Sequence, residues 1–317
     1  MRYGFGVDVG GTTVKLALFE EQGVLHSKWE IPTDRSDHGS RILPDIAASI
    51  DACLCREQID RSSVIGIGIG VPGSVLSSGV VNRCANLDWN QFHLTKVFSE
   101  MTGFPVCAAN DANAAALGEF WKGGGQNTRN MVMVTLGTGV GGGIVMEGKL
   151  LTGEHGAGAE IGHMVLNREE TEQCTCGKYG CVEQYCSATG LCRMARRALA
   201  ASDRPSLLRT NASVSCKQIF DCGKAGDPVA LEILDDFYRR MGEFIANVCI
   251  LADPEVVVFG GGVSRAGQML LDGIRPYFDS FIFHASNPIR FALATLGNDA
   301  GTWGAFRLVL DSMRDRR

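Results

Sequence analysis

The sequence predicts an α/β protein made of two similar halves. Segments with strand character alternate with helix-forming segments along the 317 residues. A Gly/Thr turn between two apolar strands occurs at residues 10–13 and again at residues 137–139. Apolar residues make up 45% of the chain and charged residues 21%, which allows a sizeable core. We therefore expect two lobes, each built around one of these turns.

The first half is expected to begin with three strands, because the glycines of residues 10–13 allow a tight turn between apolar strands. An alanine-rich run after residue 110 is a strong helix former. In order, the expected elements are strands at 4–9, 14–20 and 24–31, a helix at 42–57, strands at 64–71 and 104–109, and a helix at 111–121.

The second half follows three glycines at 123–125, which break the chain. We place the boundary there, with a first lobe of residues 1–121, a larger second lobe of residues 122–301, and a final helix within 302–317 that packs back on the first lobe. The second lobe is expected to contain strands at 131–136 and 140–147, a loop-rich stretch at 153–182, helices at 188–201 and 228–251, a strand at 255–259 and a helix at 265–277.

Composition argues against several classes of partner. A formal net charge of −5 without a Lys/Arg cluster disfavours nucleic-acid binding. The apolar stretches are shorter than the roughly 20 residues of a membrane helix, and the N-terminus has no secretory signal pattern. Twelve cysteines in such a chain are expected to be reduced thiols rather than a disulfide framework. Together these observations predict a cytoplasmic protein without a membrane or nucleic-acid partner.

The first glycine turn has residue types that suit a polyphosphate. Gly10 and Gly11 let backbone N–H groups approach an anion closely, and Thr12 adds a hydroxyl donor. Asp8, at the end of the strand, can hold Mg²⁺ through water, because this ion keeps several of its waters. Lys15 brings a positive charge. The alternative is a simple glycine hairpin in which Asp8 and Lys15 are solvated.

The second turn is richer in glycine than a hairpin needs, with Gly137, Thr138 and Gly139 inside a longer glycine run. Two such turns predict a clamp on phosphates from both sides of a cleft. Gly261 and Gly262 lie between a strand and a helix, where a nucleotide base and ribose could rest against backbone. A plain strand-to-helix turn is the alternative at that place.

Asn110 and Asp111 stand where a strand gives way to a helix. At this position Asp111 can act as a general base that accepts the proton of a sugar hydroxyl during phosphoryl transfer. Asn110 can orient a neighbouring hydroxyl through its amide. The structural alternative is that Asp111 is only the N-cap of the helix.

A Cys₃His set suited to tetrahedral Zn²⁺ follows in the loop-rich stretch. Chance clustering in a cysteine-rich chain is the alternative. We interpret the ion as structural, because no catalytic base stands beside an open ligand position. The four candidate ligands are His163, Cys174, Cys176 and Cys181.

Two carboxylates flank this set, Glu160 three residues before His163 and Glu183 two residues after Cys181. A metal that fixes these ligands would also hold both carboxylates, which can accept hydrogen bonds from sugar hydroxyls. If one nitrogen of His163 binds zinc, the other N–H can contact the substrate. Two solvated glutamates are the alternative.

These motifs, in this order, resemble those of the ROK family (repressors, open reading frames and kinases). The resemblance extends from Asp8 to about Gly304. It includes D-x-G-G-T-x-x-K at 8–15 and L-G-T-G-x-G-G-G at 136–143, and its most specific part is E-x-G-H followed by C-x-C-G-x-x-G-C-x-E within 153–183. It implies a two-lobed actin-like ATPase (ribonuclease-H-like) fold, with ATP and sugar in a cleft between lobes that close on them.

The resemblance also implies roles for individual residues. Asp111 is similar to the family's catalytic base, and Asp8, Gly11, Thr12 and Thr138 are similar to its phosphate and Mg²⁺ contacts. The implied sugar contacts are Asn110, Asp111, Glu160, His163 and Glu183, with backbone around Gly73, and the implied zinc ligands are His163, Cys174, Cys176 and Cys181. Family members are commonly dimers or tetramers, so we expect a homodimer or homotetramer.

The implied function is ATP-dependent phosphorylation of a hexose. Glucose, giving glucose 6-phosphate, is preferred because the full set of two glutamates and a histidine is present. Kinases for N-acetylmannosamine, N-acetylglucosamine, fructose or allose are alternatives within the family, and residues 77–79 and 82–89 are expected to help select the sugar. From another class, a ROK repressor would carry a helix-turn-helix segment ahead of Asp8, where there is no room for one. A non-catalytic sugar sensor is disfavoured by Asp111, Thr12 and Thr138.

Overall fold

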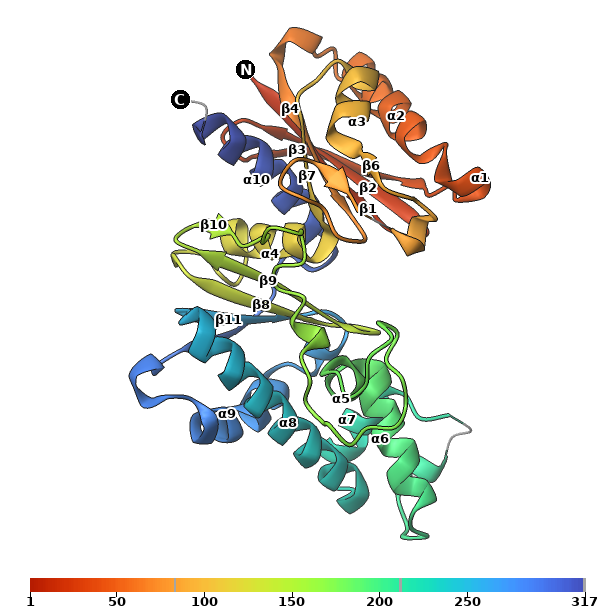
Figure 1. The fold of residues 1–317 in the computed structure, drawn as a ribbon, viewed down its shortest axis with the longest axis vertical. Coiled ribbons are helices and arrows are strands. Elements are labelled where there is room, and N and C mark those ends of the chain that lie inside the picture. Colours follow the sequence, from red (N-terminus) through yellow and green to blue (C-terminus); the bar gives the residue numbers. More distant parts are fainter. Residues whose placement is uncertain (83, 211–212, 316–317) are drawn as a thin grey trace.

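The computed structural model describes residues 1–82, 84–210 and 213–315. Its first half is built on a five-stranded sheet of order β3-β2-β1-β4-β7 (Figure 1). The three strands joined by tight turns are antiparallel, and the other two run parallel to β1. The strands are β1 (Tyr3–Val9), β2 (Thr13–Glu20), β3 (Leu25–Pro32), β4 (Val64–Val71) and β7 (Val106–Asn110).

The second half repeats this arrangement in a five-stranded sheet of order β10-β9-β8-β11-β12. Three antiparallel strands are again followed by two strands parallel to the first. The strands are β8 (Met131–Leu136), β9 (Val140–Met146), β10 (Lys149–Leu150), β11 (Val256–Gly260) and β12 (Arg290–Leu293). The two similar halves predicted from the paired Gly/Thr turns are therefore confirmed.

Helices cover both faces of the first sheet. On one face, α2 (Ile42–Arg56) and α3 (Leu94–Thr102) pack on side chains such as Phe5 and Val7. On the other, α10 (Ala300–Asp315) packs on Phe19, whose ring stacks on that of Phe306. Successive residues of β1 and β2 point to opposite faces of the sheet, so these strands pack against α2 and α3 on one face and against α10 on the other. The short α1 (Ser36–Gly39) precedes α2, and β5 (Val80–Val81) pairs with β6 (Phe92–His93).

Helices also cover both faces of the second sheet. Val132, Val134 and Phe259 face the larger core, which holds α5 (Glu183–Cys186), α6 (Ala188–Ala200), α7 (Cys216–Lys224), α8 (Pro228–Ala252) and α9 (Gln268–Phe281). Met131 and Met133 face the opposite way, against Ala116 of α4 (Asp111–Lys122). In Figure 1 the yellow helix α4 lies between the two sheets, above β8 and β9.

The helices α4 and α10 cross between the two sheets. Gly118 and Gly304 stand at the crossing, where a Cβ on Gly304 would overlap the backbone of Ala114. The chain passes from the first sheet to the second through residues 111–130 and returns through residues 294–299. The expected division into residues 1–121, 122–301 and 302–317 stays a prediction, and residues 316–317 lie outside the described residues.

Several element boundaries differ from the sequence prediction. The helix expected at 265–277 is a 3₁₀ turn over Val263–Ala266 followed by α9, because Gly267 adopts a φ of 69° between them. The helix then continues past Pro276 to Phe281. The helices α3 and α7 were not predicted from the sequence, although Leu94 and Phe98 show helical spacing. The strand β12, which has only four residues, was not predicted either.

None of the described helices is long and apolar enough to cross a membrane. Among the described residues, which include all twelve cysteines, no disulfide is formed. The expectation of reduced thiols rather than a disulfide framework stays a prediction.

Candidate functional site

Asn110 and Asp111 lie at the junction between β7 and α4. Asn110 is the N-cap: its Oδ1 accepts hydrogen bonds from the backbone N–H groups of Ala112 at 2.9 Å and Asn113 at 3.2 Å. Its Nδ2 donates to the carbonyl oxygen of Gly73 at 3.1 Å, just after β4. The alternative interpretation of Asp111 as N-cap is therefore wrong, because the capping role belongs to Asn110 and Asp111 is the first helical residue.

Asp111 is close enough to Asp8 for their charges to interact. Burial raises the pKa of Asp111 above its ordinary value, although the backbone N–H of Ala112 acts in the opposite direction. Burial also raises the pKa of Asp8 to about 6, with Lys15 lowering it and Asp111 raising it further. Two neighbouring carboxyl groups whose pKa values are raised by burial form a site where one can accept a proton and the other can face a cation.

The first glycine turn joins β1 to β2. The N–H of Gly10 donates to the carbonyl oxygen of Thr13 at 3.0 Å, and the N–H of Thr33 donates to the carbonyl oxygen of Thr12 at 3.0 Å. Thr12 is exposed, and space around Gly11 is open. Lys15 lies opposite Asp8 in the β1–β2 register, and its Nζ donates to the carbonyl oxygen of Asn298 at 3.1 Å. The turn is thus closed internally, with Gly11 and Thr12 at its surface.

The second glycine turn joins β8 to β9 in the same way. The N–H of Gly137 donates to the carbonyl oxygen of Gly139, and the carbonyl oxygen of Gly137 accepts from Ala188 at the start of α6. Gly261 lies against the end of β8: its φ is 82°, and a Cβ would lie 2.5 Å from the carbonyl oxygen of Leu136. The structure therefore brings Gly261 beside the 137–139 turn, although more than a hundred residues separate them.

The Cys₃His set forms one cluster. The four candidate ligand atoms of His163, Cys174, Cys176 and Cys181 all lie within 4.8 Å of one another. The Sγ atoms of Cys176 and Cys181 are 3.6 Å apart, and Nδ1 of His163 is 3.9 Å from Sγ of Cys174. Zinc with bonds of about 2.3 Å in a tetrahedron separates its sulfur ligands by roughly 3.8 Å. These atoms therefore fit a four-coordinate metal ion.

Electrostatics also favour a cation at this cluster. Burial and then the neighbouring thiols of Cys176 and Cys174 raise the pKa of Cys181 well above the ordinary thiol range. Without a cation, three thiolates in one place would repel one another. A divalent metal removes this cost, since it binds thiols in their deprotonated form.

Glu183 connects the cluster to the second glycine turn. Its Oε2 accepts from the N–H of Val140 at 3.1 Å, and its Oε1 accepts from Oγ1 of Thr175 at 3.1 Å. The loop before the cluster reaches the other half of the protein, where Oγ of Ser74 donates to the carbonyl oxygen of His155 at 2.8 Å. Glu160 is exposed at the end of this loop, and its carbonyl oxygen accepts from the N–H of His163.

Two cavities meet at Thr138. One, of about 370 Å³, is lined by Thr138, Gly139 and Glu183 among others. The other, of about 790 Å³, runs along α6 and the start of α7. Apart from Thr138, the residues that line this second cavity were not predicted from the sequence; they include Thr189, Cys192, Arg196 and Cys216. The helix at 188–201 was predicted, but its sequence does not indicate which face lines a cavity.

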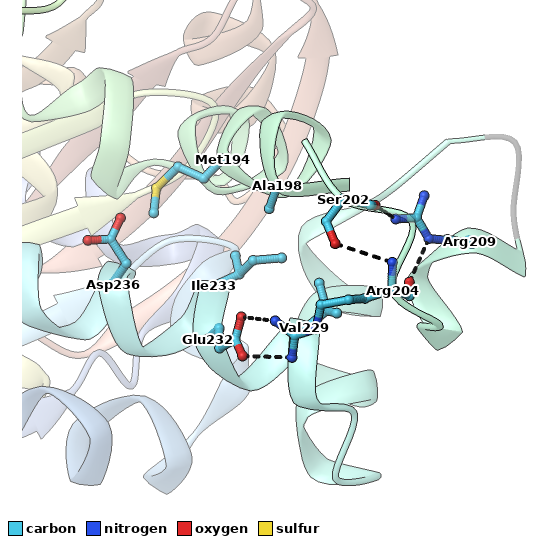
Figure 2. Close-up of a pocket in the computed structure, with 9 residues that line it drawn as sticks. All are labelled: Met194, Ala198, Ser202, Arg204, Arg209, Val229, Glu232, Ile233 and Asp236. Carbon is cyan, nitrogen blue, oxygen red and sulfur yellow. Dashed lines mark hydrogen bonds and ion pairs between the residues drawn. The ribbon is translucent and has the colours of Figure 1, made fainter. Parts of the chain in front are cut away.

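A smaller cavity of about 220 Å³ lies between α6 and α8, away from these residues (Figure 2). At its rim the guanidinium of Arg204 forms two hydrogen bonds of 2.8 Å with the carboxylate of Glu232. None of the predicted site residues lines it.

The sequence profile of the ROK family matches residues 4–312. The chain belongs to the ROK family. A glucokinase of Halalkalibacterium halodurans is 41% identical over 313 residues, which cover 97% of this chain and 95% of that protein. The xylose repressor of Caldicellulosiruptor bescii is 29% identical over 317 residues, 97% of this chain and 78% of the repressor. The relatives of this chain therefore include both a kinase and a repressor.

Among solved structures, the chain is similar to a ROK glucokinase from Streptomyces griseus in complex with glucose and AMPPNP. The TM-score is 0.75 at 34% identity, covering 96% of this chain and 98% of that one. The predicted two-lobed ROK fold of the actin-like ATPase type is confirmed by this likeness and by the family match.

Proposed function

We propose that this ROK protein is an ATP-dependent hexose kinase that converts glucose to glucose 6-phosphate. The observation that carries the proposal is the position of Asp111. This carboxylate begins α4, has a raised pKa, lies beside Asp8, and follows a strand of the sheet that carries the first glycine turn. Relatedness to glucokinases over almost the whole chain supports glucose as the acceptor.

In this proposal Asp111 is the general base. A carboxylate whose pKa is raised by burial accepts a proton more readily than an exposed one. It takes the proton of the sugar hydroxyl while that oxygen forms its bond to the γ-phosphorus and the bond to ADP breaks. The hydrogen bond of Asn110 to Gly73 fixes the backbone immediately before Asp111, which supports a defined direction for the carboxylate.

The sugar would be held by groups from both halves. We assign this role to Asn110, the backbone near Gly73, and the carboxylates of Glu160 and Glu183, with His163 between them. The contact between Ser74 and His155 brings the 153–160 loop against the segment that follows Gly73. This contact supports a binding site completed by both lobes. Arg83, within the 82–89 segment expected to select the sugar, lies outside the described residues.

The triphosphate would lie between the two glycine turns. We assign phosphate contacts to Gly10, Gly11 and Thr12 on one side and to residues 137–139 on the other, with Asp8 holding Mg²⁺ through water. The open space at Gly11 and the exposure of Thr12 and Thr138 support these roles. Lys15 contributes its charge next to Asp8 while hydrogen bonded to Asn298.

The nucleoside would extend from Thr138 into the cavity of about 790 Å³ along α6. A cavity of this size is within the range of small-molecule sites. The backbone at Gly261 stands beside the same turn, so we assign Gly261 and the following Gly262 to the ribose and base. In this proposal the two turns hold the triphosphate and this cavity receives the nucleoside.

The proposal also includes a structural zinc ion. Zinc bound by His163, Cys174, Cys176 and Cys181 would stiffen the loop that carries Glu160 and Glu183. Because Nδ1 of His163 faces Cys174, its Nε2 remains for a sugar hydroxyl. A homodimer or homotetramer, a cytoplasmic location and the absence of nucleic-acid partners stay predictions from the sequence.

A coupled assay of ADP formation with a panel of sugars tests the proposal. We expect turnover with glucose to exceed turnover with N-acetylmannosamine, N-acetylglucosamine, fructose and allose. A higher kcat/KM for one of these would reassign the substrate within the family. Glucose binding by calorimetry without any ADP formation would instead favour the non-catalytic sensor.

A further inference from the structure

Glu119, in the last turn of α4, is a fully buried carboxyl group held by three backbone donors. Its Oε2 accepts from the N–H of Gly124 at 2.9 Å and from the N–H of Thr295 at 3.0 Å. Its Oε1 accepts from the N–H of Leu296 at 2.8 Å. Burying a carboxyl group is costly unless its hydrogen bonds are satisfied, and here the backbone satisfies them.

The three donors come from the two places where the chain passes between the sheets. Gly124 lies in the outgoing connection between α4 and β8, and Thr295 and Leu296 lie in the return connection between β12 and α10. The two connections are far apart in the sequence: the N–H groups of Thr295 and Leu296 lie 176 and 177 positions after the Glu119 carboxyl group to which they donate. One carboxyl group therefore joins both connections.

The surrounding backbone fits tightly around this group. A Cβ at residue 123 would overlap Oε2 of Glu119, so Gly123 leaves room for the carboxyl group. The carbonyl oxygen of Glu119 also accepts from the N–H groups of Gly123 and Gly125, both at 3.0 Å. A carboxylate near a helix C-terminus is electrostatically unfavourable. Helix stability therefore does not explain a glutamate here, whereas its contacts with both connections do.

We propose that Glu119 is a positioning residue that couples the two connections, so that they act as one hinge. Asp111 begins and Glu119 nearly ends the same helix α4. The start of this helix packs on the second sheet, where a Cβ on Gly141 of β9 would lie 3.3 Å from Cβ of Ala112. Holding the end of α4 to the β12–α10 connection would therefore fix the position of Asp111 relative to that sheet. This inference rests on the proposed kinase function for its catalytic consequence, but the coupling itself is independent of that function.

Glu119→Gln tests the proposal because it replaces one acceptor oxygen by a donor that faces backbone N–H groups. Hydrogen exchange measured by mass spectrometry should show faster exchange in peptides from both connections, 119–131 and 293–299, including amides that do not bond to Glu119 directly. Faster exchange in one connection only, or in neither, overturns the coupling. This readout requires no turnover.

The catalytic consequence is measured as kcat beside the dissociation constant of glucose. We expect Glu119→Gln to lower kcat by about 10-fold or more, because a small misplacement of reacting groups has effects of this size. The dissociation constant of glucose should change much less than kcat, because Glu119 is not among the residues assigned to the sugar. An unchanged kcat, or equal losses in kcat, glucose binding and folded fraction, overturns the positioning role.

Glu255→Gln is the control at a glutamate that is exposed and whose carboxylate accepts backbone hydrogen bonds from one connection only. Oε1 of Glu255 accepts from the backbone N–H groups of Arg129 at 2.6 Å and Asn130 at 3.0 Å, in the outgoing connection only. Its replacement should leave kcat within about 2-fold and exchange at 293–299 unchanged. If Glu119→Gln does not fold, Glu119→Asp keeps the charge but shortens the reach, and the same readouts apply. Absence of glucose-dependent turnover in the unmodified protein would contradict the proposed function and leave hydrogen exchange to decide the coupling.

Discussion

Glu183 accepts a hydrogen bond from the backbone N–H of Val140 at 3.1 Å, which joins the Cys/His loop to the second glycine turn. Glu183 follows Cys181 by two residues, so its position depends on the cluster. If the loop became disordered, this bond would be lost and the turn assigned to the phosphates would lose one of its contacts.

Loss of the metal is therefore expected to reduce both stability and turnover. Metal analysis of the purified protein should find one zinc per chain. Cys176→Ser should lose the zinc, lower the thermal unfolding midpoint and remove most glucose-dependent turnover. Cys55→Ser, at an exposed cysteine of α2, is the control and should retain zinc. A purified, folded and active protein without zinc would contradict the structural role.

Asp8 is expected to destabilise the ligand-free protein at neutral pH. Folding raises the pKa of Asp8 from 3.8 to about 6, so the folded state binds its proton more tightly than the unfolded state. The stability from protonated Asp8 is fully present below pH 3.8 and is lost as the pH rises through about 6. Asp8→Asn should therefore raise the free energy of unfolding at neutral pH, by about 1–3 kcal/mol, while it removes turnover.

Urea unfolding of both proteins at neutral pH and near pH 5 measures this effect. The gain from Asp8→Asn should be smaller at the lower pH, because wild-type Asp8 is then largely protonated in the folded state. An equal gain at both pH values would show that burial of a charge at Asp8 is not its cause.

Gly261 should tolerate substitution much less than its neighbour Gly262. An alanine at 261 would adopt a φ of 82° and place its Cβ 2.5 Å from the carbonyl oxygen of Leu136. We expect Gly261→Ala to cost about 1–3 kcal/mol of stability and to raise the KM for ATP by displacing the adjacent 137–139 turn.

Gly262→Ala is the stability control, since nothing lies within 4 Å of its Cβ position and its φ is −63°. It should change the free energy of unfolding by less than about 0.5 kcal/mol. Equal losses in the two variants would contradict the structural requirement at Gly261.

The sequence was sufficient for features that are local. The glycine turns flanked by apolar strands, and the spacing of Cys174, Cys176 and Cys181, are patterns within a few residues. At the N-terminus of α4 the N-cap preference indicated Asp111, which is the wrong residue. Asn110 caps the helix, because its Oδ1 accepts hydrogen bonds from two backbone N–H groups. Asn and Asp are both good N-caps, so composition alone does not separate them.

The sequence was not sufficient for contacts between distant segments. The bonds from Ser74 to His155 and from Thr295 to Glu119 depend on how the two halves of the protein meet. The bond from Val140 to Glu183 depends on how the Cys/His loop packs on the second sheet. No local pattern encodes these pairs. The cavity along α6 was missed for the same reason, because it exists only once α7 packs beside α6.

The most direct test of the central claim is glucose-dependent ADP formation by Asp111→Asn and the unmodified protein, measured together with glucose affinity by calorimetry. The account predicts a loss of about 10²–10⁴-fold in kcat, the usual contribution of a general base, with glucose affinity largely retained. Asn110 and its bond to Gly73 should be unaffected. A kcat for Asp111→Asn near that of the unmodified protein would contradict the account.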